Sequence, residues 1–274
     1  MRIARAGLGA VAAALVATLA VVACGATSTA GSAVTESPSS ADTTSGRSSG
    51  TPTPKAPGDD QLSPANLSSE LLTRLAEKNT FRVVSRTTTP GKADAVVTAD
   101  LRIKGDHAGL IATGGGRKVV KLGSTLYLKD AELTGDRSRP WSELAPGGES
   151  SRSADRLARA AQVHALIGGA AHATTFQRAD RITVNGAPAQ EYVVTIDLAR
   201  ATAADALGDY LTTADLPSLP EAMTLRIAVD AHCLPVQLRF TQGRSQVLAT
   251  FSRFGQKLTL TPPSPSRIAT PPTT

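Results

Sequence analysis

The sequence predicts an α+β domain with a strongly curved antiparallel sheet and helices packed on one face. Apolar and polar residues alternate in many short runs joined by short turns, which is typical of antiparallel strands. Three other segments space apolar residues three and four apart, as helices do. The sequence lacks the regular alternation of strands and helices that would indicate a parallel sheet.

The cleanest strand pattern covers Ala95–Lys104, where apolar residues occupy every second position. A strand at Phe81–Thr87 precedes it, with Pro90 and Gly91 marking the turn between the two. Asn185 and Gly186 predict a hairpin whose loop is longer than two residues. The remaining predicted strands are Ala108–Thr113, Lys118–Leu122, Thr125–Leu128, Ile182–Val184, Glu191–Leu198, Met223–Asp230, Leu234–Thr241, Gln246–Phe254 and Lys257–Leu260. The last four are expected to form an antiparallel meander.

The predicted helices cover Ser68–Lys78, Ser153–Ile167 and Ala199–Tyr210. A serine can cap the first helix, whose leucines share one face. Gly168 and Gly169 are expected to end the second helix, which is rich in alanine.

The N-terminal segment predicts export. Arg2 and Arg5 precede an uncharged, apolar run from Ala6 to Ala23, as in a secretory signal. Val21-Val22-Ala23-Cys24 resembles the lipobox of bacterial lipoproteins. The lipobox predicts a signal peptide at residues 1–23 and lipidation of Cys24. An ordinary signal or an uncleaved anchor is the alternative.

Residues 24–64 are rich in Ser, Thr, Gly and Pro and hold almost no large apolar side chains. Such a segment cannot bury enough surface to fold, so it predicts a flexible tether. Residues 263–274 share this composition and are expected to be disordered. The folded domain is then residues 65–262, long enough for one core of good size.

Composition and motifs argue against several classes of function. The formal charge of +6 is spread along the chain and aromatics make up 3%, so nucleic-acid binding has little support. The run Gly114–Lys118 lacks the phosphate-loop pattern and is expected to be a turn. No catalytic, metal or cofactor site is predicted, and the protein is not expected to be an enzyme. The residues considered were His107, His164, His172 and His232, and the acidic loop residues Asp130, Glu132 and Asp136.

The order of several segments is similar to the LppX/LprAFG lipoproteins of mycobacteria and related actinobacteria. The matching pieces are the lipobox, the tether, Leu71-Leu72 with Leu75, Gly123–Tyr127, the Trp141 segment, Ile182–Gly186 and Phe251–Lys257. The resemblance implies a half-barrel sheet with helices over its concave face, enclosing an apolar cavity. It also implies binding of acylated lipids or lipoglycans and their traffic through the cell envelope. The charged Ser142–Arg156 region departs from this pattern.

A lipid-carrying sheet needs one apolar face that is not filled. The candidate lining residues are Val97, Leu101, Ile103, Leu126, Leu128, Val194, Ile196, Leu225, Ile227, Leu238 and Phe251. Alanines at many helix positions could leave a void against this face. They could equally allow close packing and a filled core.

Two hypotheses for the function are therefore compatible with the sequence. The first is a lipid-binding lipoprotein, held at the extracytoplasmic face of the cell membrane by its lipid anchor. An acylated lipid or lipoglycan would be its ligand and a membrane transporter a further partner. The second is a tethered envelope binding or sensor module with a filled core and no lipid cargo. If Cys24 is lipidated, Cys233 has no intrachain partner. It would then be either a buried, inert residue or a reactive thiol, and the inert residue is the expectation.

Overall fold

The structure is a computed structural model that describes residues 62–105, 108–145, 149–211, 217 and 219–269. All of them belong to one compact unit, Pro52–Thr274. The predicted signal peptide, Cys24 and nearly all of the predicted tether lie outside the described residues.

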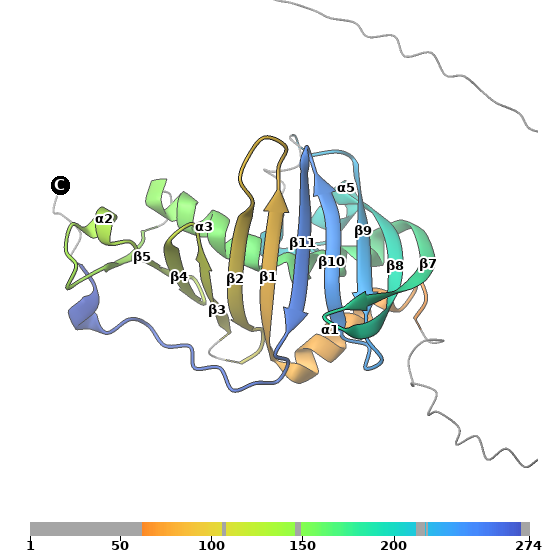
Figure 1. Cartoon of the computed structure of the whole chain (residues 1–274), viewed down its shortest axis with the longest axis horizontal. Coiled ribbons are helices and arrows are strands. Elements are labelled where there is room, and N and C mark those ends of the chain that lie inside the picture. The colour runs from red at the N-terminus through yellow and green to blue at the C-terminus, as the bar shows by residue number, and fades with distance from the viewer. Residues whose placement is uncertain (1–61, 106–107, 146–148, 212–216, 218, 270–274) are drawn as a thin grey trace, which may run out of the picture. The chain divides into compact units, whose positions relative to one another are not determined.

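A single open antiparallel sheet of 11 strands dominates the domain, in the order β6-β5-β4-β3-β2-β1-β11-β10-β9-β8-β7 (Figure 1). The predicted α+β class is thereby confirmed. The strands are β1 Thr80–Thr88, β2 Ala95–Arg102, β3 Gly109–Gly114, β4 Arg117–Leu122, β5 Thr125–Lys129, β6 Trp141–Glu143, β7 Ala173–Val184, β8 Ala187–Asp197, β9 Ala222–Val229, β10 Pro235–Gln242 and β11 Ser245–Ser252.

The sheet consists of two meanders joined at the middle. The first runs from β1 to β6, and the second runs from β7 to β11. They meet where β11 pairs with β1, with Val83 opposite Phe251. This closure brings the first and last strands of the domain together, and loop-closure entropy makes such non-local pairing slow to form.

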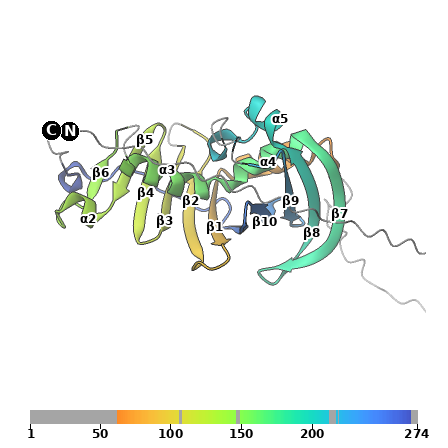
Figure 2. The same cartoon turned by 90° about the horizontal axis from the view of Figure 1, so that it is seen from above.

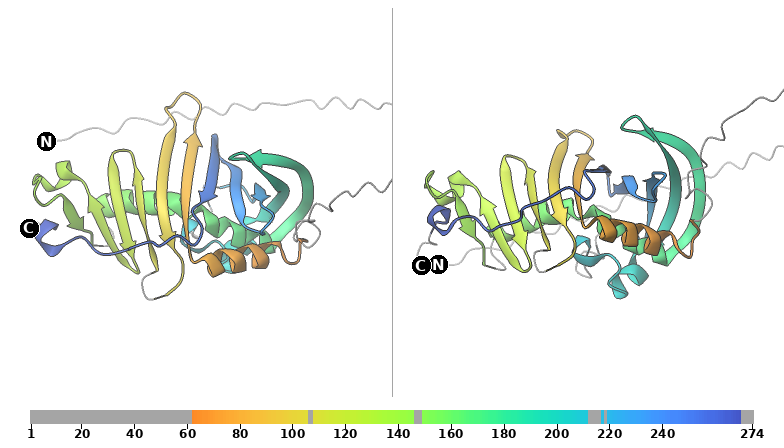
Figure 3. Two further views of the ribbon diagram at one scale, coloured as in Figure 1. Left: turned by 60° about the horizontal axis from the view of Figure 1, so that its bottom comes forward. Right: turned by 90° about the horizontal axis from the view of Figure 1, so that it is seen from below.

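Helices cover one face of this curved sheet, the concave one (Figure 2). The helices are α1 Leu67–Lys78, α2 Ala131–Thr134, α3 Glu149–Ala161, α4 Leu166–Gly169 and α5 Leu198–Ala203, with short 3-10 turns η1 Val163–Ala165, η2 Ala170–His172, η3 Gly208–Tyr210 and η5 Pro265–Arg267. Helix α3 contacts β1 to β5, while α1 packs on α4 and η2. Seen from the lower side, α1 runs along the ends of the strands (Figure 3).

The predicted helix at Ser153–Ile167 is broken into α3, η1 and α4. The prediction that Gly168 and Gly169 end it is wrong, because both belong to α4 and the residues that follow are still right-handed. A Cβ added at Gly168 would lie 2.2 Å from the backbone oxygen of Ala206. Gly168 therefore serves a close backbone approach, and Gly169 serves close packing against the Leu207 side chain, rather than a helix end.

Three strand and helix boundaries differ from the sequence prediction. Ile182–Val184 is only the end of the long strand β7, and Asn185 and Gly186 form a two-residue turn with φ of 50° and 83°. Both φ values are positive, as a type I′ hairpin turn requires. No strand covers Lys257–Leu260, and the predicted helix at Ala199–Tyr210 splits into α5 and η3.

The segment after β11 runs along the lower ends of β1 to β6 (Figure 3). The hydroxyl of Thr80 donates to the carbonyl of Gln256 at 2.6 Å. Ala269 N donates to the carbonyl of Trp141 at 2.7 Å, and Ile268 forms a parallel bridge with Trp141. Residues 263–269, which the sequence predicts to be disordered, are thus held against the edge strand β6 as far as they are described.

Candidate functional site

The structure places all eleven candidate lining residues on the buried face of the sheet. Nine of them are at most 6% exposed, and Val97 and Ile103 are partly buried against the same cluster. Cross-strand pairs bring them side by side, for example Leu225 opposite Val194 and Ile227 opposite Leu238. The period-two pattern therefore identified the buried face, and these residues form one continuous apolar surface.

Small residues of α3 meet this surface. Ala154, Ala158 and Ala161 are at most 2% exposed. Opposite them, a Cβ added at Gly114 would lie 3.1 Å from Leu157 Cδ1. The small side chains here permit close helix-to-sheet packing.

Packing is close around α4. Leu166 and Ile167 are fully buried. Gly169 lies so close to Leu207 that a Cβ would approach Leu207 Cδ2 to 2.7 Å. The hydroxyl of Ser68, on α1, donates to the carbonyl of Gly168 at 3.3 Å. This part of the helical layer is filled.

A pocket of about 310 Å³ lies beside η1, where β2 ends and β3 begins. It reaches the candidate apolar face, since two of the candidate residues line it. The lining residues are Leu101, Arg102, Ile103, Ala108, Gly109, Leu110, Lys121, Gly123, Gln162 and His164. Its volume is at the lower end of the range of about 300–1,000 Å³ found for small-molecule sites.

His164 forms the helical wall of this pocket. Its ring packs edge-on against Phe81, with ring centroids 5.2 Å apart. Its Nδ1 is shielded from solvent and has no hydrogen-bond partner among the described residues. Burial lowers the pKa of His164 to about 4, so the imidazole is neutral at physiological pH.

Lys121 lies on the sheet wall of the same pocket. It pairs across the strands with Leu110 on one side and Leu126 on the other, so it shares their face. Lys121 is not among the candidate lining residues, although its spacing of two from Val119 places it on the buried face. Gln162 and His164 could not be assigned to this pocket in the same way, because the helix predicted at Ser153–Ile167 breaks between α3 and η1 and its period no longer shows which way they face.

Two larger depressions, each of about 660 Å³, are lined partly by charged side chains. The first surrounds the turn at Gly115 and Gly116, where Arg117 Nε lies 3.2 Å from Asp130 Oδ2. The turn predicted there is confirmed. The second depression is lined partly by Arg226 and Arg239, which face each other across β9 and β10.

In the acidic loop, the carboxylates of Asp130 and Asp136 accept hydrogen bonds from backbone N–H groups of the loop itself. Asp130 Oδ1 accepts from the backbone N of Glu132 and Leu133, at 3.0 and 3.1 Å. Hydrogen bonds from Ser138 and then Arg139 hold the pKa of Asp136 far below its usual range. Within the described ranges, no group of three or more His, Cys, Asp or Glu side chains is placed to hold a metal ion.

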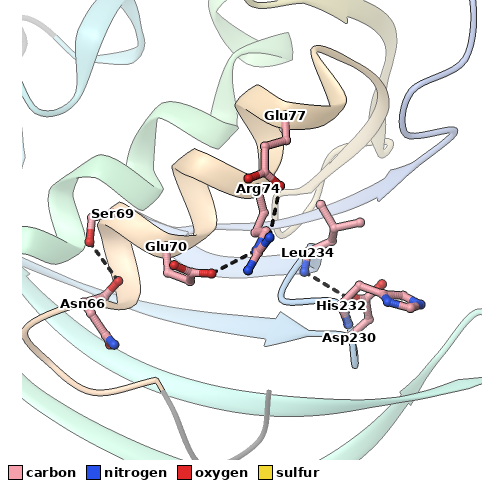
Figure 4. A network of polar contacts seen from close by, with 8 residues as sticks. All are labelled: Asn66, Ser69, Glu70, Arg74, Glu77, Asp230, His232 and Leu234. Atoms are coloured by element: carbon pink, nitrogen blue, oxygen red, sulfur yellow. Dashed lines mark hydrogen bonds and ion pairs between the residues drawn. The ribbon is translucent and has the colours of Figure 1, made fainter. Parts of the chain in front are cut away.

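Cys233 lies in the turn between β9 and β10, next to α1. The exposed face of α1 carries an ion-paired chain in which Arg74 contacts Glu70 at 2.9 Å and Glu77 at 3.1 Å (Figure 4). Asp230 Oδ1 holds the turn by accepting from Leu234 N at 2.9 Å (Figure 4). Cys233 is 7% exposed, and burial, followed by the charge of Glu70, raises the pKa of its thiol. A raised pKa disfavours the reactive thiolate, as expected for an inert cysteine.

Among the described helices, none is both long and apolar enough to cross a membrane. Cys24 lies outside the described residues, so its lipidation stays a prediction.

Comparisons with known proteins give fold neighbours only. No protein-family model matches the sequence, and no curated protein matches it. The chain is similar to the Mycobacterium tuberculosis lipoprotein LppX, with a TM-score of 0.44, 22% identity, and coverage of 71% of this chain and 98% of the other. It is also similar to LprF from Mycobacterium bovis, with a TM-score of 0.47, 12% identity, and coverage of 73% and 96%. For a LolA superfamily protein from Nitrosomonas europaea the TM-score is 0.30 at 12% identity, with coverage of 70% and 94%.

Proposed function

We propose that this chain is an exported lipoprotein that binds acylated lipids or lipoglycans and helps to move them through the cell envelope. Cys24 would carry the lipid anchor and residues 25–64 would tether the domain at the extracytoplasmic face of the membrane. In this proposal the chain acts as a carrier rather than an enzyme, and its family is that of the LppX/LprAFG lipoproteins. A membrane transporter would supply or receive the lipid.

One observation carries the lipid-binding proposal: a solvent-accessible pocket opens onto a continuous apolar sheet face. Leu101 and Ile103 belong both to the pocket wall and to that face. Burying an acyl chain there would be favourable by about 0.8 kcal/mol for each methylene removed from water. Separation of the helical layer from the sheet would extend the site beyond the pocket.

The second candidate is a tethered binding module that carries no lipid. The tight packing of Gly168 and Gly169 against residues 206–207 favours it, because that part of the core has no room for a chain. This module would use its outer surface to contact a membrane protein or a cell-wall polymer.

Native mass spectrometry of the compact unit Pro52–Thr274, made in a lipid-rich host, separates the two candidates. Lipid binding predicts added mass that disappears on organic extraction and gives fragments of acyl lipids. An apo mass that stays unchanged after incubation with added lipid would favour the binding module. The mass of the N-terminal peptide of the full chain tests the anchor separately: cleavage before Cys24 plus diacylglycerol is expected.

A further inference from the structure

The segment after β11 is held to the sheet at its two ends. We name residues 253–269 the strap. Near its start, Gly255 N donates to the carbonyl of Thr80 at 2.8 Å, and at its end Ala269 N donates to the carbonyl of Trp141 at 2.7 Å. Between these ends the strap, all of which the structure describes, contains no strand, and its three prolines have no N–H to donate. A segment with few backbone hydrogen bonds opens locally at a lower free energy than a sheet does.

Two neighbouring positions of the sheet bond carbonyls of the strap that are two residues apart. Thr80 and Arg102 lie opposite each other across β1 and β2, so they share one face. The Thr80 hydroxyl donates to the carbonyl of Gln256 at 2.6 Å, and the Arg102 guanidinium donates to the carbonyl of Leu258. A hydrogen bond from a charged donor is about twice as strong as a neutral one. Thr80 and Arg102 together therefore hold the first half of the strap.

The strap is bonded to strand ends that also line the pocket beside η1. Arg102 contributes to the pocket wall, as does Gly109, which lies opposite it on β3. Leu101 contributes to the same wall from the buried face of β2. Successive side chains of a strand point to opposite faces, so Arg102 bonds the strap on one side of β2 while Leu101 borders the pocket on the other. The strap therefore holds the sheet wall of the pocket from its outer side.

The strap is also linked to the helical wall of the pocket, through aromatic rings. Phe254 is partly buried against the main core, and its ring centroid lies 6.4 Å from that of Phe81. Phe81 in turn packs edge-on against His164, which lines the pocket. Both walls of the pocket are therefore linked to the strap, the sheet wall through Arg102 and the helical wall through Phe254 and Phe81.

The pocket is small for an acylated lipid. Its volume of about 310 Å³ is at the lower end of the range for ligand sites, and α4 beside it is closely packed. The helical layer and the sheet therefore have to separate before an acyl chain can enter. Because the strap is linked to both walls of the pocket, it resists this separation.

We propose that the strap is a gate for lipid entry. While Thr80 and Arg102 hold the carbonyls of Gln256 and Leu258, the paired ends of β1 and β2 stay close to η1 and the pocket stays small. When these two bonds open, the strap leaves the strand ends, the pocket widens toward the apolar sheet face, and an acyl chain enters. The gate rests on the lipid-binding function proposed above and adds the element that controls how fast the lipid enters and leaves.

Amide hydrogen exchange tests the opening of the strap itself. The full chain is anchored in phosphatidylcholine vesicles, and exchange is followed by mass spectrometry. Arg102→Met keeps an aliphatic side chain and removes the guanidinium. It should speed exchange about tenfold in the strap, at the end of β2 and in η1, which is the size expected for one charge-assisted hydrogen bond. Exchange in β9 should stay unchanged, which would show that the fold persists.

The rates of lipid binding test the gate. The probe is an anthroyloxy-labelled stearate, whose fluorescence is excited by energy transfer from Trp141, the only tryptophan of the chain. Because a gate has to open for entry and for release, Arg102→Met should raise the association and dissociation rate constants by a similar factor, about tenfold. The dissociation constant should stay within about threefold of the wild type. Thr80→Val, which removes a neutral hydrogen bond, should raise both rate constants about threefold.

Arg82→Met is the matched control for Arg102→Met. Arg82 lies in β1, on the same face as Arg102, and donates to the carboxylate of Asp100 at 2.8 and 2.7 Å. Its replacement removes a guanidinium from this face without touching the bonds to the strap. It should therefore change neither hydrogen exchange in the strap nor the two rate constants.

The outcomes separate the gate from the general function. Probe binding with the same two rate constants in the wild type and in Arg102→Met would overturn the gate and leave lipid binding standing. A rise in the dissociation rate constant alone would also overturn the gate, because it would make Arg102 part of the binding site. Faster exchange confined to the strap would contradict its link to the pocket walls. Absence of probe binding by the wild type would overturn both proposals.

Discussion

Two neighbouring parts of the helical layer pack differently against their surroundings: α4 is closely packed, and η1 borders a pocket. At α4, the backbone comes so near residues 206–207 that a Cβ at Gly168 would lie 2.2 Å from an oxygen. At η1, immediately before α4 in the chain, a pocket of about 310 Å³ is lined by His164 and by residues at the end of β2 and the start of β3. Small residues close the first region, and a larger polar residue borders an opening in the second. The difference shows that alanine and glycine content alone does not locate a void.

The largest expected effect is at the closed region. Gly168→Ala should lower the free energy of unfolding by about 3 kcal/mol, the upper end of ordinary overpacking, because backbone must move. Gly169→Ala should cost about 1 kcal/mol, since the atom in the way is the end of the Leu207 side chain. Urea unfolding measures both. Equal costs would mean that the backbone approach at Gly168 is relaxed easily.

A pair of large substitutions compares the two regions directly. Ile167→Trp should cost about 2–3 kcal/mol, because Ile167 is fully buried in the closed region. Ile103→Trp should stay within about 0.5 kcal/mol of the wild type, since the pocket has room for the larger side chain. Thermal unfolding of the two variants provides the measurement, and a large loss for Ile103→Trp would contradict an open pocket.

The pH dependence of stability should report the burial of His164. Its pKa falls from about 6.5 in the unfolded chain to about 4 in the folded one. Between these values the unfolded chain binds a proton that the folded chain does not, so the free energy of unfolding decreases as pH falls. From pH 7 to pH 5 this group should remove about 2 kcal/mol. His164→Leu should lose this part of the slope; an unchanged slope would mean that other groups produce it.

The smallest effect is expected on the outer face of β2, away from both regions. Arg82 donates to both carboxylate oxygens of Asp100, at 2.8 and 2.7 Å, and about a quarter to a third of each side chain is exposed. Asp100→Asn should cost about 0.5 kcal/mol, as for other solvent-accessible ion pairs. It should leave lipid binding unchanged. A cost comparable to that of Gly168→Ala would show that the outer face also governs the stability of the sheet.

The sequence by itself determined most of the strands and the face that each of these buries. It missed β6 and most of β7, and it placed a strand at Lys257–Leu260 that the structure lacks. Period-two alternation works for β2, β8 and β9 because successive side chains must point to opposite sides of a pleated strand. The same alternation places Lys121 on the buried face, although a charged residue is not expected there. Local turn chemistry at Asn185 and Gly186 marked the hairpin, while the loop length depended on where β8 begins.

Only the tertiary structure decided how the two meanders join and where the helical layer is closed or open. The pairing of β1 with β11, and the contact of Gly168 with Ala206, connect residues whose separation leaves no periodic trace in the sequence. The same is true of the C-terminal segment, whose composition predicts disorder although its backbone bonds to Trp141. Local patterns report which way a side chain faces, because that follows from backbone geometry. The space between two packed layers depends on the side chains of both, and only their assembled positions determine it.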